Sequence, residues 1–171
     1  MKKTFFAITI SLCLLVCTNV CAQYGKIGKS EAAAPAKAVF FELGGPGLAS
    51  INYDMRFTKS ETGIGGRVGV GGFSINVNTD KTSVIFIPVG LNYLMGKDGR
   101  NYFELGGGVT FVNASNNTSN SNFGTTFGNI NFGYRLQPKD GGFFFRAAIN
   151  PVFGKGFFLP YYGGIAFGYK F

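Results

Sequence analysis

Bulky apolar side chains alternate with small or polar ones along most of the sequence after residue 37, and this period of two limits the chain to few folds. In the last segment, for example, Ile165, Phe167 and Tyr169 alternate with Ala166 and Gly168. Successive side chains of a β-strand point to opposite faces, so strict alternation predicts strands with two chemically different faces. No helical apolar period accompanies the pattern, and we therefore predict an all-β protein.

Clusters of turn-forming residues divide the alternating region into eight predicted strands. The connections at 58–63, 96–101 and 137–142 are short and charged, whereas the connection at 114–124 is the longest and most polar. An even number of strands brings both ends of a closed barrel to the same side. The first hairpin leaves one alternative open, because it could be a single long strand bent at its glycines. The eight predicted strands are 38–43, 47–57, 64–77, 84–95, 102–113, 125–136, 143–153 and 158–171.

The two faces of the predicted strands differ in charge. The apolar face carries no charged residue, whereas charged residues gather on the other face. A soluble barrel would turn its apolar face inward, whereas a membrane barrel turns that face to lipid and its polar face to the lumen. We favour the membrane barrel, because it accounts for both faces. The charged residues predicted to face the lumen are Glu42, Asp54, Arg56, Arg67, Glu104, Arg135 and Arg146.

Arginine suits a charge buried in a narrow barrel, because its planar guanidinium forks onto carboxylates. Four of the five arginines occupy predicted lumen-facing positions, together with three carboxylates. We predict that these seven side chains form a structural charge network in the lumen. If Phe57 and Ile64 flank the turn at 58–63, Asp54 lies opposite Arg67, and the two should form an ion pair.

Two positions disturb the alternation. Val68 and Val70 share the apolar face before Gly71–Gly72, but Phe73 and Ile75 share it afterwards, so we predict a β-bulge at the two glycines. Pro88 lies inside a predicted strand although it lacks an N–H group. A closed barrel has no free edge for such a residue, and we predict a second bulge there.

Residues 1–22 have the composition of a secretory signal peptide. Lys2 and Lys3 precede an apolar run over 5–16, and small residues occupy the −3 and −1 positions of a cut after Ala22. The apolar run falls short of the about 20 residues that a membrane-spanning helix needs.

Two alternatives to a signal peptide are an N-terminal membrane anchor, for which the apolar run is too short, and a lipoprotein leader. In a lipoprotein leader Cys17 or Cys21 would be acylated, but both cysteines follow valine rather than a smaller residue. Residues 23–37 are small, charged and contain proline, which predicts a flexible N-terminal arm. The barrel then occupies residues 38–171.

The composition argues against catalysis. The sequence contains no histidine, and its three cysteines all lie in the predicted leader. The barrel therefore lacks a thiol nucleophile, an imidazole base and the usual soft metal ligands. We predict a non-enzymatic protein with no catalytic, cofactor-binding or metal-binding residues. The lysines are dispersed over turns and ends, so the basic charge does not indicate nucleic-acid binding.

The C-terminal residues resemble the targeting signal of outer-membrane barrels, because Phe171 is terminal and Tyr169 and Phe167 occupy alternate preceding positions. By that resemblance, these three aromatic residues would be recognised by the barrel-assembly machinery. The segments ELGGPG, INYDMRF, GLNYLMG and FGYKF belong to a wider pattern over nearly all of 38–171. That pattern resembles the small eight-stranded outer-membrane proteins of Bacteroidetes, of the OmpA/OmpX barrel type, and implies an eight-stranded antiparallel up-and-down transmembrane barrel.

The predicted function follows from these readings. We predict a structural or surface-interaction role, in which loop 114–124 is displayed to an extracellular partner. The alternative is a narrow channel or a carrier of a small apolar ligand. We expect contacts with outer-membrane lipids and the assembly machinery, no nucleic acid, and a monomeric barrel. Because short turns are periplasmic in bacterial barrels, both termini should be periplasmic.

Overall fold

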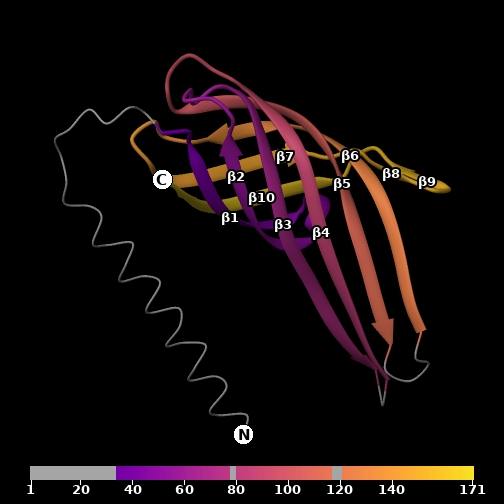
Figure 1. Cartoon of the computed structure of the whole chain (residues 1–171). Coiled ribbons are helices and arrows are strands. Elements are labelled where there is room, and N and C mark those ends of the chain that lie inside the picture. Colours follow the sequence, from indigo (N-terminus) through magenta and orange to yellow (C-terminus); the bar gives the residue numbers. More distant parts are fainter. Residues whose placement is uncertain (1–33, 78–79, 117–120) are drawn as a thin grey trace, which may run out of the picture. The chain divides into compact units, whose positions relative to one another are not determined.

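The computed structural model describes residues 34–77, 80–116 and 121–171, so the predicted signal peptide and most of the predicted arm lie outside the described residues (Figure 1). No helix in this part of the chain is long and apolar enough to cross a membrane. The elements are β1 (Lys37–Gly44), η1 (Gly45–Gly47), β2 (Ala49–Arg56), β3 (Gly63–Val77), β4 (Asp80–Met95), β5 (Asn101–Asn116), β6 (Ser121–Leu136), β7 (Gly142–Ile149), β8 (Val152–Gly154), β9 (Phe157–Leu159) and β10 (Gly163–Lys170).

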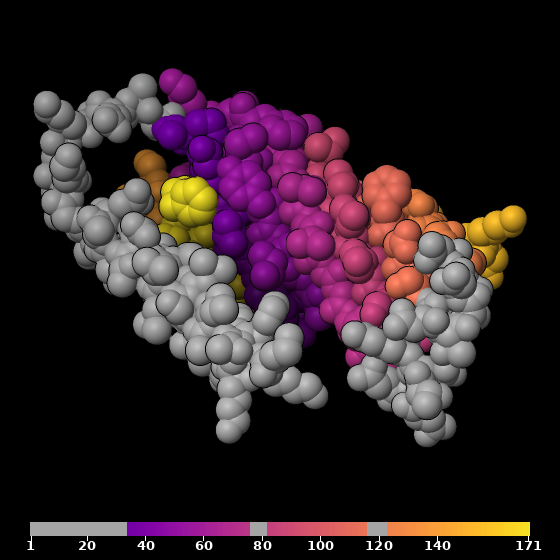
Figure 2. Space-filling view, turned by 60° about the horizontal axis from the view of Figure 1, so that its bottom comes forward, coloured from indigo at the N-terminus to yellow at the C-terminus, as the bar shows by residue number. Residues whose placement is uncertain are grey.

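The strands close into one antiparallel barrel. Each strand from β1 to β6 pairs with the next, β7 pairs with β10, β10 pairs with β1, and the short β8 pairs with β6 and β9. Phe171 and Lys37 exchange backbone hydrogen bonds of 2.9 and 3.3 Å where the two ends of the barrel meet. Figure 2 shows the yellow C-terminal end against the indigo first strand. The predicted eight-stranded fold is confirmed, and the first hairpin consists of two strands, because Glu42 pairs with Ser50 across it.

Two of the eight barrel strands are interrupted at prolines. β7 and β8 are separated by Asn150 and Pro151, and β9 and β10 are separated by three residues that begin at Pro160. The pairing runs from Ile149↔Gly163 to Val152↔Leu159, so the second strand contains one extra residue, which is a bulge.

The bulge changes which face Leu159 occupies. The alternation of Ile165, Phe167 and Tyr169, continued backwards without a break, predicts Leu159 on the apolar outer face, but Leu159 pairs with Val152, which is buried on the lumen side. The alternation of the last strand therefore reverses between β9 and β10. The expectation for Leu159 was wrong, because the sequence pattern passes through the bulge without a visible break.

The two bulges predicted in β3 and β4 do not occur. β3 and β4 keep one register from Val68↔Val89 to Gly71↔Phe86, with no extra residue on either strand. Pro88 pairs with Thr110 of β5, whereas the ladder to β3 is interrupted beside it. Proline lacks one N–H group, so it removes pairing on one edge only and needs no extra residue.

The barrel wall has two heights. β3 to β6 have 15 or 16 residues each, whereas β1, β2 and β7 have 8. The long strands extend beyond β1, β2 and β7 at the end opposite the C-terminus, where the β8–β9 hairpin also reaches outward (Figure 1). β3 has no pairing with β2 after Gly71, and β6 has none with β8 before Gly128. We call residues 72–77, 80–85, 113–116 and 121–127 the projecting sheet.

The projecting sheet corrects two predicted loops. Within the connection expected at 114–124, residues 114–116 belong to β5 and 121–124 to β6, and residues 80–83 of the connection at 78–83 belong to β4. The remaining 117–120 and 78–79 lie outside the described residues. A polar composition suggested loops, but serine, threonine and asparagine also occur on water-facing strand positions.

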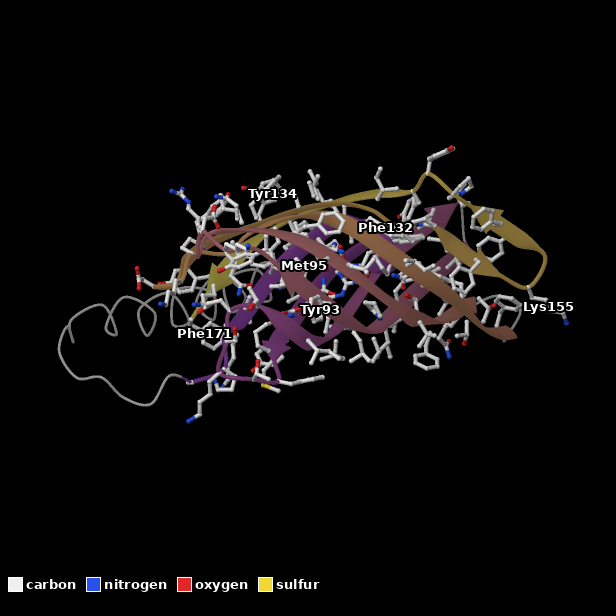
Figure 3. All side chains as sticks on the ribbon, turned by 90° about the horizontal axis from the view of Figure 1, so that it is seen from above. Tyr93, Met95, Phe132, Tyr134, Lys155 and Phe171 are labelled. Carbon is white, nitrogen blue, oxygen red and sulfur yellow. The ribbon has the colours of Figure 1, made fainter. Side chains whose placement is uncertain are left out.

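The outer wall of the barrel is apolar. Ile51, Val70 and Leu91 each expose more than half of their surface, and they belong to a band of exposed large apolar side chains on every long strand. Figure 3 shows side chains along the whole wall between Phe171 at one end and Lys155 at the other. An apolar exterior around a polar interior is the pattern of a lipid-facing barrel.

Candidate functional site: the luminal charge chain and the projecting sheet

The seven charged residues predicted to face the lumen are all buried and are joined by ion pairs. They come from six different strands, yet each carboxylate contacts two guanidinium groups. The result is one chain in which positive and negative groups alternate. We call it the luminal charge chain, in the order Arg56, Asp54, Arg135, Glu104, Arg146, Glu42 and Arg67.

Arg135 occupies the centre of this chain. Its two Nη atoms donate to the two oxygens of Asp54 at 3.0 and 3.1 Å, and its Nε donates to Glu104 at 2.7 Å. The guanidinium also lies over the ring of Phe144 at 5.1 Å, and that ring stacks on Phe40 at 4.7 Å. The bidentate and aromatic contacts both depend on the planar guanidinium, which a lysine could not replace.

The predicted ion pair of Asp54 and Arg67 is only half right. The register is confirmed, because Asp54 and Arg67 are direct partners of β2 and β3. The ion-pair partner is wrong, since Arg67 Nη1 donates to Glu42 at 3.4 Å. Both oxygens of Asp54 already accept hydrogen bonds from Arg135, and Arg56 adds a third at 2.7 Å. Arg135, which reaches Asp54 across the lumen from β6, therefore already occupies both carboxylate oxygens.

Neutral amides complete the charge chain, and the sequence reasoning missed them. Asn92 Nδ2 donates to Asp54 at 2.5 Å, and Asn131 Nδ2 donates to Glu104 at 3.0 Å. Arg135 Nη1 also donates to Gln137 at 3.3 Å. Asn92 and Asn131 fall on lumen-facing positions of the predicted strands, so the signal that identified the arginines could have identified them, whereas Gln137 lies in the predicted connection at 137–142.

A turn covers the lumen at the rim where the C-terminus lies. Glu61, in the turn between β2 and β3, accepts hydrogen bonds from Lys170 at 2.6 Å and from Gln137 at 3.0 Å. Lys170 is buried and also donates to the carbonyl of Lys139 at 2.5 Å. Sequence analysis counted Lys170 among the lysines at strand ends, because a contact from a distant turn leaves no trace in the alternation.

The connection η1 fills the lumen at the other end. Gly45, Pro46 and Gly47 are buried, and Thr110 Oγ1 of β5 donates to the carbonyl of Pro46 at 3.1 Å. Gly44 and Gly45 have φ of 72° and 65°, which favours glycine. A Cβ on Gly45 would lie 2.7 Å from a carboxylate oxygen of Glu42. This segment was predicted as a simple turn, and it instead packs onto the luminal charge chain.

The polarity of the sheet inverts where it leaves the barrel. In the projecting sheet, the outer face carries Ser74 and Ser83, whose hydroxyls lie 3.2 Å apart, and also Asn113. The inner face carries Phe73 and Phe123, which are exposed. The apolar side chains of β3 therefore do change face at Gly71–Gly72, as the sequence indicates, but no bulge causes the change. The register stays constant, and the inner face of the strand passes from the filled lumen to the open projecting sheet.

The turn between β4 and β5 is held by Asp98. Its carboxylate accepts a hydrogen bond from the Asn101 side chain at 2.5 Å, and others from the backbone N–H groups of Arg100 and Asn101 at 3.0 and 2.7 Å. These hydrogen bonds, the Asn101 side chain first among them, lower the pKa of Asp98 to about 2. The turn keeps its negative charge in mild acid.

The C-terminal aromatics expected to act as an assembly signal lie on the outer wall. Phe167, Tyr169 and Phe171 are exposed in the same band as the other apolar side chains. Phe167 packs against Phe145 at 5.3 Å between ring centres, with the two rings tilted by 48°. This position suits a lipid-facing strand, and the recognition role stays a prediction.

Comparisons with known proteins support the fold alone. No family model matches the sequence, and no curated protein matches it. The N-terminal β-barrel domain of Pseudomonas aeruginosa OprF is similar in structure, with a TM-score of 0.57, 16% identity, and coverage of 80% of this chain and 96% of that domain. Ail, the attachment invasion locus protein of Yersinia pestis, solved with the heparin analogue sucrose octasulfate, has a TM-score of 0.51 and 13% identity, with coverage of 80% and 96%. Both are small eight-stranded outer-membrane barrels. The resemblance to Bacteroidetes proteins stays a prediction.

Proposed function

We propose that the chain is a non-enzymatic barrel of the bacterial outer membrane whose projecting sheet binds an extended segment of another protein at the cell surface. The observation that carries the proposal is the projecting sheet itself, which has two free edges and an exposed apolar inner face. The barrel beneath it serves as a rigid support. In this proposal the partner binds to the strands of the projecting sheet, and not to a loop at 114–124 as the sequence suggested.

The location rests on the surfaces of the barrel. The outer wall carries the apolar band expected of a lipid-facing barrel, and the charged groups lie inside. Bacterial barrels have short periplasmic turns and longer extracellular connections. Beyond the part of the wall that pairs on both edges, the longest excursions of the chain are 72–85 and 113–127, at the end opposite Phe171. We therefore assign the rim that holds Phe171 to the periplasm and the projecting sheet to the exterior.

The free edges define what the partner looks like. Residues 72–77 of β3 pair only with β4, and residues 121–127 of β6 pair only with β5, so each segment has one edge with no neighbouring strand among the described residues. Unpaired N–H and C=O groups on such an edge can accept an added strand. The inner face beside these edges is apolar and the outer face is polar, so the partner segment should itself alternate between apolar and polar side chains.

The apolar inner face also favours a second candidate, a carrier of a small apolar ligand. Phe73 and Phe123 would contact such a ligand directly, and Phe73 packs against Phe86 at 5.9 Å between ring centres. The narrow channel has less support. The luminal charge chain, the stacked Phe40 and Phe144, and the buried η1 all occupy the lumen.

Hydrogen exchange on the purified barrel in detergent tests the proposed function. The probe is a soluble peptide that alternates valine with lysine. We expect the backbone amides of 72–77 or 121–127 to exchange more slowly when the peptide is added, while those of the central strands β4 and β5 stay unchanged.

The matched variants are Phe73→Ser, on the inner face, and Val70→Ser, three residues away on the lipid-facing wall. Phe73→Ser should weaken the peptide effect at least tenfold, and Val70→Ser should leave it intact. Protection that spreads evenly over all strands, or that survives Phe73→Ser unchanged, would contradict strand addition. Displacement of the peptide by a fatty acid would favour the carrier.

A further inference from the structure

The luminal charge chain is not electrically balanced. It contains four guanidinium groups and three carboxylates, and the other buried charge among the described residues, Lys170, has its own partner in Glu61. One positive charge is therefore left over inside the barrel. An uncompensated charge away from bulk water is strongly unfavourable, so a counter-charge or a polar solvent group is expected beside it.

The two ends of the chain differ in how well they are satisfied. Both Nη atoms of Arg56 are used, in hydrogen bonds to Asp54 at 2.7 Å, to the carbonyl of Gly63 at 3.0 Å and to Asn92, and only its Nε is buried without a partner among the described residues. Within the described part of the chain, the only hydrogen bonds of the Arg67 guanidinium go to Glu42, at 3.4 and 3.5 Å. Those distances are long for a charge-assisted hydrogen bond, which is usually about 2.7–2.9 Å. The excess charge is thus concentrated at the Arg67 end.

Arg146 adds a second free donor at the same place. Its Nη1 donates to Glu42 Oε1 at 2.5 Å, the oxygen that Arg67 also contacts, so the two guanidinium groups meet at one carboxylate. Its Nη2 is buried and has no hydrogen-bond partner among the described residues. Two cationic groups with unused donor capacity therefore lie next to each other.

We propose that the lumen binds one small monovalent anion of the halide class between Arg67 and Arg146, beside Glu42. One negative charge balances the excess. The connection η1 packs against Glu42 on the side toward the projecting sheet. The approach is so close that a Cβ on Gly45 would clash with the Glu42 carboxylate. That close packing favours a single spherical ion over a branched oxyanion. The proposal does not depend on partner binding by the projecting sheet.

Thermal unfolding in detergent tests this site, with chloride as the probe. The unfolding midpoint is measured in sodium chloride and in sodium gluconate at equal ionic strength, because gluconate is too large for the site. Binding to the folded state alone should raise the midpoint in chloride by several degrees, with a saturating dependence on concentration. Equal midpoints in the two salts would overturn the proposal and leave water as the solvating group.

Two variants with the same change of charge separate a local site from a general salt effect. Arg67→Gln removes the excess charge at the proposed site, and Arg100→Gln removes one positive charge from an exposed turn outside the luminal charge chain. We expect Arg67→Gln to abolish the difference between chloride and gluconate, and Arg100→Gln to retain it. Loss of the difference in both variants, or in neither, would refute a site at Arg67.

Anomalous diffraction from crystals of the unaltered protein grown in sodium bromide does not depend on the folding of any variant. We expect one bromide peak within about 3.5 Å of Arg146 Nη2, at hydrogen-bonding distance for a large anion. Ordered crystals with no anomalous peak inside the barrel would overturn the proposal.

Discussion

The same four strands, β3 to β6, pass through two regions of opposite polarity. Inside the barrel their inner face carries charged and amide groups such as Arg67 and Glu104, and their outer face is apolar. In the projecting sheet the inner face carries Phe73 and Phe123, and the outer face carries serine and asparagine. The register does not change between the regions. In the proposed outer-membrane location, the apolar face reports what surrounds the strand at that height, with lipid beside the barrel and water beside the projecting sheet.

The largest expected effect comes from the charge chain, which the barrel has and the projecting sheet lacks. Asp54→Ala should leave Arg135 and Arg56 without their shared carboxylate and lower the free energy of unfolding by about 3–5 kcal/mol. Urea unfolding in micelles measures the loss. Asp140→Ala, in an exposed turn, is the control and should change little.

A second substitution then tests the wiring of the chain. Adding Arg56→Ala to Asp54→Ala should recover part of the loss, because Arg56 contacts Asp54 directly. Adding Arg67→Ala should recover nothing, because Arg67 contacts Glu42 instead. Recovery on adding Arg67→Ala but not Arg56→Ala would mean that Asp54 forms its ion pair with Arg67, its direct partner on β3.

Truncating an aromatic residue should lower the free energy of unfolding far more inside the barrel than in the projecting sheet. Phe144→Ala removes a ring that is fully buried between Phe40 and Arg135, and such truncations cost about 3–5 kcal/mol. Phe123→Ala removes a ring that is already 64% exposed, so the cost should stay within about 0.5 kcal/mol. The same urea titration compares them, and equal losses would contradict an open inner face.

A lysine on the outer face of β4 should be costly in one region and harmless in the other. Leu91→Lys places a charge in the apolar band of the barrel, where about 2–4 kcal/mol is expected at mid-depth in a bilayer. Ser83→Lys lies on the same face of the same strand in the projecting sheet and should be close to neutral. Refolding into lipid vesicles measures both, and a neutral Leu91→Lys would argue against a lipid-facing wall.

The smallest effect concerns the turn between β4 and β5, at the rim where the C-terminus lies. The pKa of Asp98 is lowered from 3.8 to about 2 by hydrogen bonds, chiefly from Asn101. A lowered pKa means that the charged form is favoured in the folded state, so its contribution is present above about pH 4 and is lost as the pH falls to about 2. The fully exposed site makes the effect small. Asp98→Asn should flatten this part of the stability profile, and an unchanged profile would show that the turn does not depend on the charge.

Much of the barrel could be predicted from the alternation alone, because a residue's face in a strand depends only on its parity. That is why the eight strands and the inward positions of Glu42 and Arg146 were accessible from the sequence. The partners of those charges were not accessible. Arg67 meets Glu42 and Asp54 meets Arg135 across the lumen, and such contacts depend on the tilt and closure of the whole barrel.

Local exceptions were equally hidden. The bulge between β9 and β10 leaves apolar residues on both sides, so the pattern continues through it unbroken. The inversion after Gly71 produced a visible change of pattern, but the sequence could not distinguish an inserted residue from a change of environment. Pairing data decide between them, because Gly71↔Phe86 continues the register of Val68↔Val89.

The central claim is that the membrane boundary crosses β3 to β6 where their polarity inverts. Spin labels on single cysteines along the outer face of β4, at Ser83, Ile85, Ile87, Val89 and Leu91, test it in lipid vesicles through their accessibility to oxygen and to a water-soluble nickel chelate. We predict that oxygen dominates at Ile87, Val89 and Leu91, and that the chelate dominates at Ser83, with the crossover near Ile85. Oxygen-dominated accessibility at every position, Ser83 included, would contradict a projecting sheet in water.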